Sequence, residues 1–504
     1  MPTKRIISQE LVADSCLAVR EVLTANDPTS PVTTPIQVKE LPTAIRSIPH
    51  GMYGVRKDRS VNNTALTRIG SEYLHRTLPI HEEIMRCVVN DDGTVNYWLH
   101  PSDSRFKMNG ELAKLDGTDG QIMVRIPKHF YKDDIYTDSV TGHEIEDSCV
   151  SKFNMPGYKL FKEQFYSFSE AVLDRTLNKL SCVVNATARF RGGNNTSGWD
   201  ETYRSLLGMP ATSINLTTFR TYAANRGTGW TAHNNNIYEA ICRLYKIEYA
   251  NTNIQLAFTS TLTAEGYHQG GLGSGVTNMP DWNGYNGYNP IVPCGVTLSL
   301  GNSTGVVNYA VKNSAGTTVY TAPVPSYRGI ENFFGHVWKH TDGLLVEIQS
   351  AEAGGLSKVY KCENHTKFSS SITADYEYIG NEARSEGWTK NVLTPAMVAS
   401  EVGANSSTGW ADYHYTNIPS SGSAVRCVLF GGNANNGTNA GFAYANSNNA
   451  PSNANANVGS RLNLTPYKKK HQNDPATLPL GKTVSKKQKG VGRAAQAVSK
   501  TPLV

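Results

Sequence analysis

Asparagine side chains dominate one segment near the end of the chain, where they could form hydrogen bonds with a ligand. Ten asparagines lie between Asn433 and Asn457, and Ala, Gly and Ser fill most of the remaining positions. This composition is typical of disordered segments. However, residues 424–430 have the pattern of a buried strand, and residues 458–464 have the pattern of its return partner. We therefore expect an ordered polar surface, and such a surface favours ligand binding.

A carboxamide offers donors and an acceptor with little bulk, so it can adapt to different partners. Strong binding usually depends on Tyr, Trp or Arg, and the aromatic candidates of this segment are Phe442 and Tyr444. We therefore expect weak binding that many copies strengthen through avidity; the alternative is a solvated loop that binds nothing. The predicted ligand-binding residues are Asn433, Ala434, Asn435, Asn436, Thr438, Asn439, Phe442, Tyr444, Asn446, Asn448, Asn453, Asn455 and Asn457.

A second block, YRGIENFFGHVWKHTDG at residues 327–343, contains side chains that could do chemistry. Asn332, His336 and Asp342 would be metal or catalytic groups in an enzyme. We favour a core segment instead, because its four large apolar residues are of the kind that bury. The predicted core residues are Phe333, Phe334, Val337 and Trp338, and the predicted ion pair joins Arg328 to Glu331.

The cysteines do not form a reactive or metal-binding motif. Eight are present, at positions 16, 87, 149, 182, 242, 294, 362 and 427, so each stands alone in its part of the sequence. No zinc spacing occurs, and we expect no metal or cofactor. Scattered cysteines favour buried, reduced thiols and folding in a cytoplasm, although a disulfide between distant members stays open. The glycine-rich run at 270–275 lacks the GK[ST] ending of a phosphate-binding loop and predicts a flexible loop.

The positive charge is concentrated at one end. The formal net charge is +6, but nine basic residues and one acid follow Tyr467, and the rest of the chain carries 39 basic and 41 acidic residues. A nucleic-acid-binding fold is therefore not indicated. The tail could contact phosphates, but docking onto an acidic protein surface is the favoured interpretation.

The sequence predicts no signal peptide and no membrane insertion. The opening stretch, MPTKRIISQELVADS, lacks an apolar core. No run of about 18 apolar residues follows. A protein of this kind would leave the cell by another route, such as assembly into a particle released by lysis.

The chain divides into three expected regions. Residues 1–79 form an assembly arm with a helix at 8–23 and a Pro/Thr segment at 27–42; residues 80–465 form the main domain; residues 466–504 form a basic, low-complexity tail. Within the main domain we expect a hairpin from 85–90 and 94–99, a strand at 122–126, helices at 164–180, 216–225 and 236–250, and short strands with long loops after residue 255.

Three blocks, taken in order, resemble one family. They are NLTTFRTYAANRGTGW with IYEAICRLYKIEYAN (215–251), the block at 327–343, and VLFGGNANNGTNAGFAYANSNNAPSNANANVGSRL (428–462). Together they resemble the C-type-lectin-fold proteins of tailed phages, which are similar to the variable proteins of diversity-generating retroelements, including phage tropism determinants. The resemblance covers residues 80–465. It implies an α+β, C-type-lectin-like domain of the formylglycine-generating-enzyme subtype.

The resemblance also implies a function. In such proteins the last segment, here 428–462, is a variable surface in which a reverse transcriptase randomises adenines, and asparagine codons are rich in adenine. Gly431–Gly432 and Gly459–Leu462 would be fixed scaffold. Formylglycine-generating activity needs a close cysteine pair, and the cysteine that precedes Cys427 is as distant as Cys362, so we expect no enzyme.

The predicted function is a non-enzymatic phage virion protein that is made in the host cytoplasm and attaches to a host-surface glycan or protein. The arm and tail would bind other virion proteins, and trimers are common among similar adhesins, so we expect a homotrimer. The alternative is a structural virion component, namely a head fibre, capsid decoration or tail-assembly subunit, whose lectin-type domain serves packing.

Overall fold

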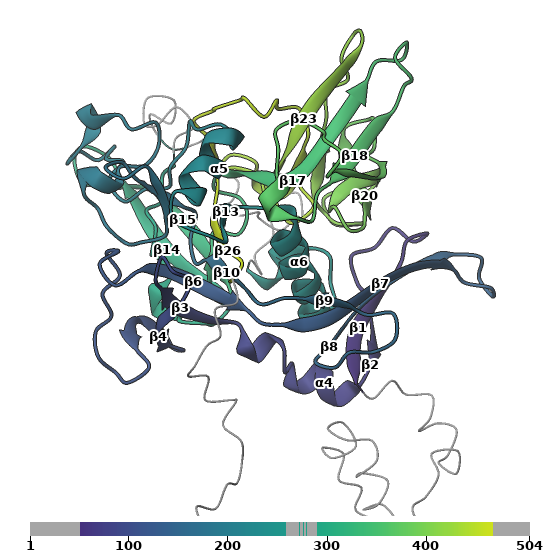
Figure 1. Ribbon diagram of the computed structural model, residues 1–504, viewed down its shortest axis with the longest axis horizontal. Coiled ribbons are helices and arrows are strands. Elements are labelled where there is room, and N and C mark those ends of the chain that lie inside the picture. Colours follow the sequence, from purple (N-terminus) through teal and green to yellow (C-terminus); the bar gives the residue numbers. More distant parts are fainter. Residues whose placement is uncertain (1–50, 259–271, 273–275, 277–278, 280–289, 467–504) are drawn as a thin grey trace, which may run out of the picture. The chain divides into compact units, whose positions relative to one another are not determined.

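Strands make up most of the fold. The computed structural model describes residues 51–258, 272, 276, 279 and 290–466 (Figure 1). These residues contain 26 strands, most of them short, and three α-helices. The described part is therefore mostly β-sheet with few helices, richer in strands than the α+β expectation. The predicted helix at 8–23, the Pro/Thr segment at 27–42, most of the glycine-rich run and the tail beyond Pro466 lie outside the described residues.

The first sheet holds five antiparallel strands and begins well before residue 80. β1 (Met52–Asp58) pairs with β8 (Glu144–Ser151) over its whole length, and Tyr53 and Val55 are buried. Residues 51–79, which we assigned to the arm, thus belong to the folded body, because β1 supplies part of its core. The sheet order is β2 (Thr67–Gly70), β1, β8, β7 (His129–Thr137) and β9 (Lys159–Phe161).

The second sheet joins strands from distant parts of the chain. The predicted hairpin is confirmed as β3 (Met85–Val89) and β4 (Val95–His100), and the predicted strand at 122–126 is confirmed as part of β6. The sheet order is β13 (Trp230–Ala232), β26 (Leu462–Leu464), β10 (Gln164–Ser167), β6 (Gln121–Ile126), β3, β4 and β5 (Asp103–Lys107).

The predicted helix at 164–180 is wrong. This segment forms β10, then β11 (Val172–Asp174), and then the start of β12 (Lys179–Ser181). β10 lies between β6 and β26, which supply backbone hydrogen-bond partners on both sides. Pairing with distant strands therefore outweighed the local helical pattern.

The third sheet carries the asparagine-rich segment. β17 (Trp338–Gln349) lies at its centre, between β18 and β23 (Figure 1). β23 (Ser423–Phe430) confirms the strand predicted at 424–430. The sheet order is β19 (Glu377–Asn381), β18 (Ser357–Lys361), β17, β23, β24 (Ala445–Asn446), β22 (Tyr413–Tyr415), β20 (Gly387–Leu393) and β21 (Val398–Val402).

The predicted return strand at 458–464 does not pair with β23. It is split into β25 (Val458–Gly459), which pairs in parallel with β17, and β26, which pairs with β10 and β13 of the second sheet. Arg461 lies at the break and is fully buried. Its guanidinium donates hydrogen bonds to the carbonyl oxygens of Ser167, at 3.2 Å, and Asn332, at 2.7 Å. These hydrogen bonds connect the break to the end of β10 and to the block at 327–343.

Two predicted helices are confirmed, and an asparagine caps each of them. In α5 (Leu216–Ala224) the Asn215 side chain accepts a hydrogen bond from the Thr218 amide, and in α6 (Asn235–Tyr249) Asn234 accepts one from the Ile237 amide. α6 is buried along most of its length and contacts β17, β1 and β8, so it joins the first and third sheets. In the part of the chain that the structure describes, no helix is long and apolar enough to cross a membrane.

The remaining elements are short. The third helix is α4 (Glu72–Thr77), and a small sheet is formed by β14 (Gly305–Lys312), β15 (Thr318–Tyr327) and β16 (Ile330–Glu331). Single 3-10 turns are η2 (His81–Glu83), η3 (Ala188–Phe190), η4 (Ser197–Trp199), η5 (Ile254–Ala257), η7 (Leu298–Leu300), η8 (His365–Lys367) and η9 (Gly437–Asn439).

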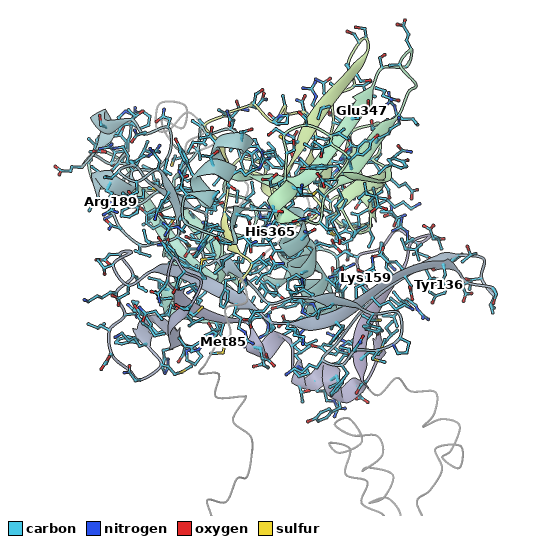
Figure 2. The ribbon with its side chains drawn as sticks, viewed as in Figure 1. Met85, Tyr136, Lys159, Arg189, Glu347 and His365 are labelled. Atoms are coloured by element: carbon cyan, nitrogen blue, oxygen red, sulfur yellow. The ribbon has the colours of Figure 1, made fainter. Side chains whose placement is uncertain are left out.

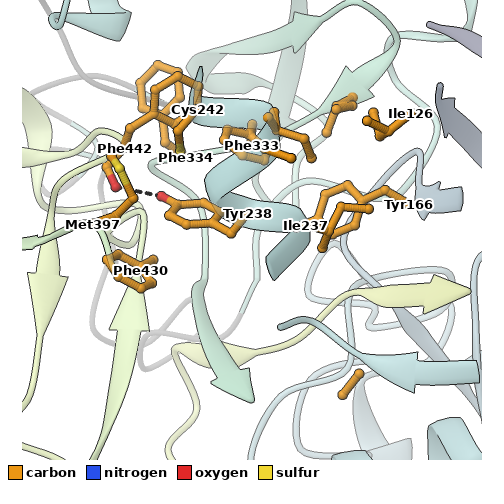
Figure 3. Close-up of a cluster of buried hydrophobic side chains, with 14 of the residues drawn as sticks. Ile126, Tyr166, Ile237, Tyr238, Cys242, Phe333, Phe334, Met397, Phe430 and Phe442 are labelled. Carbon is orange, nitrogen blue, oxygen red and sulfur yellow. Dashed lines mark hydrogen bonds between the residues drawn. The ribbon is translucent and has the colours of Figure 1, made fainter. Parts of the chain in front are cut away.

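An aromatic cluster around Tyr238 forms the centre of the core (Figure 3). The Tyr238 ring stacks on Phe430 with ring centroids 4.7 Å apart and on Phe333 at 5.3 Å. Its hydroxyl donates a hydrogen bond of 2.7 Å to the carbonyl oxygen of Phe442. Tyr238 therefore connects α6, the block at 327–343 and the asparagine-rich segment.

The hydroxyl of Tyr238 provides a test of this connection. Tyr238→Phe leaves the Phe442 carbonyl buried without this donor, so we expect the free energy of unfolding to fall by roughly 1–3 kcal/mol. Urea unfolding monitored by tryptophan fluorescence measures the change. The control is Tyr222→Phe, because that ring is only partly buried. An equal loss in both variants would contradict the role of the hydrogen bond.

Candidate functional site

The asparagine-rich segment, residues 433–457, is held in the third sheet by its backbone. It leaves β23 through Gly431 and Gly432, whose φ angles of 93° and 78° lie in the left-handed region. The Gly431 amide donates to the Tyr444 carbonyl at 3.1 Å, and β24 pairs with both β23 and β22. A composition typical of disorder is therefore ordered here by strand pairing.

Close packing also fixes the middle of the segment. The Asp412 carboxylate accepts a hydrogen bond of 2.7 Å from the Ala443 amide. A Cβ atom on Gly441 would lie 1.9 Å from Asp412 Oδ1, so any other residue at this position would require the Asp412 side chain to shift. Glu382 accepts hydrogen bonds from the Ser447 hydroxyl at 2.7 Å and from Thr416 at 3.2 Å. Two buried carboxyl groups thus hold the segment by accepting hydrogen bonds from Ala443 and Ser447.

The predicted contact residues differ in exposure. Among them Asn435 and Asn455 are exposed. The partly buried members are Asn436, Thr438, Asn439, Asn446, Asn448, Asn453 and Asn457, and the buried members are Asn433, Ala434, Phe442 and Tyr444. The segment therefore presents a small part of its polar surface to solvent.

Phe442 does not serve as an aromatic anchor on the surface. Its side chain is fully buried, with ring centroids 4.8 Å from Phe333 and 4.9 Å from Tyr245 (Figure 3). The prediction that it contacts a ligand is wrong, because the aromatic core of α6 and the block at 327–343 takes this ring. Local spacing could not reveal which aromatic residue of the segment faces inward.

Several asparagine side chains bind the segment itself. Asn436 Oδ1 accepts a hydrogen bond of 2.6 Å from the Asn433 amide, and Asn446 Oδ1 accepts one of 2.9 Å from the Asn448 amide. Asn449 Oδ1 accepts a hydrogen bond of 2.8 Å from the Asn453 side chain. Part of the asparagine content is therefore used to hold turns in place, as asparagine commonly does.

The remaining side chains surround a shallow hollow of about 250 Å³ at the start of the segment. Tyr444 lies on one side, with its ring centroid 4.6 Å from that of Trp338 on β17. Tyr415, at the end of β22, is 38% exposed. The hollow is lined by Trp338, Tyr415, Asn433, Asn435, Asn436, Tyr444, Asn446 and Asn457.

The structure thus brings six predicted residues together and adds two that the sequence did not indicate. Trp338 was assigned to the core, and it is buried, but one part of it also borders the hollow. Tyr415 carried no signal, because it lies on a separate strand and reaches the hollow through the parallel pairing of β22 with β24. The other seven predicted residues lie outside the hollow, namely Ala434, Thr438, Asn439, Phe442, Asn448, Asn453 and Asn455.

The block at 327–343 is mainly a core segment. Phe333, Phe334, Val337 and Trp338 are buried, as predicted. The predicted pair between Arg328 and Glu331 is wrong. Arg328 instead binds Glu248 at 2.7 Å, because Glu331 points inward and accepts hydrogen bonds from the Gly295 and Thr297 amides.

The polar residues of this block are paired inside the fold. His336 Nδ1 lies 2.5 Å from the Glu170 carboxylate, and its Nε2 accepts hydrogen bonds from the Ile291 and Val292 amides. Asp342 forms an ion pair with Arg220 at 2.7 Å. Within the described ranges, no group of three or more His, Cys, Asp or Glu side chains could hold a metal ion.

The seven cysteines of the described part are free and buried. Cys427 Sγ lies 3.7 Å from His340 Nδ1, but the thiol also donates to the Asn449 carbonyl at 3.3 Å. Burial raises the pKa of Cys427 to about 12, so the group stays a neutral thiol at physiological pH. Nothing in this arrangement activates the sulfur for thiol chemistry.

A larger cavity, of about 440 Å³, lies away from the asparagine-rich segment, between α6, β9 and η8. His365, labelled beside α6 in Figure 2, lies on its rim. Its buried charges neutralise one another, since Glu239 pairs with both Lys361, at 2.9 Å, and Arg243, at 2.5 Å. The charged part of this lining is therefore internally paired, whereas the lining of the hollow carries no charge.

The comparisons with known proteins find little similarity to this chain. No family model and no curated protein matches the chain. Among the solved structures that match, a Major Tropism Determinant U1 variant is similar to it at 15% sequence identity and a TM-score of 0.21. The match covers 60% of this chain and half of the length of that one. A similarity this slight supports no conclusion about the fold or the function of this chain.

The buried carboxyl group of Glu382 makes the support of the segment sensitive to pH. Burial raises its pKa to about 7, while hydrogen bonds from Ser447 and Thr416 oppose the rise. The folded state therefore holds a proton more tightly than the unfolded state, so stability falls as pH rises from about 4.5 to 7 and then levels off. Replacing the group with a neutral amide, Glu382→Gln, removes this dependence.

We expect Glu382→Gln to unfold at a higher urea concentration than the wild type at pH 8, with a stability difference of up to about 3 kcal/mol that shrinks towards pH 5. Urea unfolding at several pH values measures this difference. The matched control is Glu377→Gln, because Glu377 is exposed on β19. A pH-independent difference between Glu382→Gln and the wild type would contradict the assignment.

Proposed function

We propose that this chain is a non-enzymatic, receptor-binding protein of a phage particle, and that the hollow in its asparagine-rich segment contacts a host-surface ligand. The observation that carries the proposal is the hollow itself. Six polar or aromatic side chains of one ordered segment converge there with Trp338 and Tyr415 from two other strands. Convergence of this kind is the usual form of a binding site.

The proposed scaffold is a C-type-lectin-like domain of the formylglycine-generating-enzyme subtype. Its support is the resemblance of the three sequence blocks, which contact one another in the core through Tyr238, Phe333 and Phe442. The enzymatic activity of that subtype is not part of the proposal, because Cys427 is a buried, neutral thiol. We also propose no cofactor.

The scaffold makes a variable surface physically reasonable. Backbone pairing and the carboxylates of Asp412 and Glu382 hold the segment, while the side chains of Asn435 and Asn455 extend into solvent. Changes at such exposed positions cost little stability. Diversification by a retroelement would therefore alter the ligand surface without altering the fold.

Assembly is proposed to occur through the ends of the chain. Residues before 51 and the basic tail would bind other virion proteins, and three copies would associate as a homotrimer. Nucleic acid is not proposed as a partner, because the charge outside the tail is nearly balanced. Many copies on a particle would compensate for a weak single site.

One observation favours the alternative, a structural virion component such as a head fibre, a capsid decoration or a tail-assembly subunit. Phe442 and Tyr444 are buried, and two of the predicted contact residues are exposed. A segment with so little exposed side-chain surface could instead pack against a neighbouring virion protein. The two functions differ in whether the hollow faces outward on the particle.

Binding through the hollow can be tested with the full-length chain. We expect Tyr415→Ala and Asn435→Ala to lower binding to bacterial cells at least about tenfold, because each removes contact groups from the hollow without touching the core. The measurement uses fluorescent beads that display many copies, on a panel of bacterial species. Asn308→Ala on β14 is the control, since that side chain is exposed and lies on a different sheet. Unchanged binding by both hollow variants would contradict the proposal that the hollow contacts the ligand.

The position of the hollow on the particle can be tested by labelling. We expect Asn435→Cys to react with a maleimide dye on intact particles, because the seven described native thiols are buried. Particles that carry the wild-type chain give the background. Protection of this cysteine in particles, with normal reaction in the purified chain, would favour the structural alternative.

A further inference from the structure

The chemistry of the hollow is neutral. Among the described residues that line it, five are asparagines and three are aromatic, and none carries a charge. The nearest cation along β17, Lys339, is 1% exposed and lies 3.3 Å from the Glu170 carboxylate, so the core neutralises it. A ligand carboxylate, sulfate or phosphate would find no counter-ion here, and a desolvated charge without a partner is unfavourable.

One side chain of the hollow lacks a partner. Asn433 is 5% exposed, and its Oδ1 has no hydrogen-bond partner among the described residues. Its backbone is fixed, because the amide donates to Asn436 Oδ1 and the residue forms a bridge with His336. A buried acceptor without a donor is costly, and native proteins rarely leave one unexplained. This oxygen has almost no solvent-accessible surface, so a ligand in the hollow would contact the exposed side chain of Asn435 instead.

The aromatic residues give the hollow an apolar wall. Tyr415, Trp338 and Tyr444 border the same space as the carboxamides. An aromatic ring can cover the C–H face of a ligand while its polar edge remains wet. The hollow is also smaller than the pockets that usually enclose drug-sized molecules, so it accommodates one ring-sized group.

We propose that the hollow binds a single neutral sugar ring of a surface glycan, such as a hexose or an N-acetylhexosamine. The sugar hydroxyls exchange hydrogen bonds with the carboxamides of Asn435, Asn436 and Asn446, while a C–H face lies against the aromatic wall. Acidic sugars are excluded by the absence of a cation among the described residues of the lining. This inference rests on the proposed function and specifies its ligand.

Asn435 provides the decisive variant. Its side chain is exposed and lines the hollow, so we expect Asn435→Ala to lower binding to an array of neutral oligosaccharides at least about tenfold, with an unchanged urea midpoint. The matched control is Asn448→Ala, because Asn448 lies in the same segment outside the hollow. Unchanged binding of Asn435→Ala to the array would overturn the role assigned to the carboxamides.

The charge preference is tested on the same array, which carries neutral and acidic oligosaccharides and is probed with beads displaying the full-length chain. We expect binding to neutral members, and lost binding to the same members for Tyr415→Ala. Binding restricted to acidic oligosaccharides would overturn the inference, since the lining would then have to neutralise charge.

Treatment of cells separates failure of this inference from failure of the proposed function. We expect periodate, which cleaves sugar diols, to abolish bead binding to bacterial cells, and protease treatment to leave it intact. Binding that survives periodate and is lost after protease would overturn the sugar ligand while leaving a receptor-binding protein. Cell binding that is equal in the wild type and the hollow variants would overturn both.

Discussion

The hydrogen bonds of the buried Arg461 guanidinium fix the position of the last strands of this fold. It is fully buried, and its hydrogen bonds reach the carbonyl oxygens of Ser167 and Asn332, on two distant parts of the chain. The rings of Tyr166 and Phe333 lie 5.4 and 6.0 Å from it, within the range of cation–π attraction. A buried cation is tolerated only with such partners. The chain that follows the asparagine-rich segment must therefore bring Arg461 to the carbonyl oxygens of Ser167 and Asn332.

This fixed return explains why a polar, apolar-poor segment can be ordered. Its start is fixed by β23 and two glycines with positive φ, its middle by Asp412 and Glu382, and its end by β25 and Arg461. Few of these contacts use the outward side chains. The asparagines then divide between two tasks, since Asn436, Asn446 and Asn449 hold turns while others line the hollow. The segment is therefore ordered mainly by its backbone pairing and by the buried residues Asp412, Glu382 and Arg461.

Local signals predicted the elements that are determined locally. α5 and α6 each have an asparagine cap and an apolar stripe, and the β3–β4 hairpin has an Asp-Gly turn, so all three were predictable. The errors involve partners that are distant in sequence. Residues 164–167 form β10 because β6 and β26 flank them, Arg328 pairs with Glu248 instead of Glu331, and Phe442 packs in the core, where its carbonyl accepts a hydrogen bond from Tyr238.

The candidate site shows the same difference between features determined locally and features that depend on distant residues. The sequence indicated the proposed binding segment by its composition, but it could not separate asparagines that hold the backbone from those that line the hollow, because both have the same side chain. It also could not indicate Tyr415, which joins the hollow only through the pairing of β22 with β24. A neutral lining follows from this arrangement, since Lys339 and Glu170 neutralise each other within the core. The neutral character of the hollow therefore depends as much on where the fold places its charges as on the asparagines themselves.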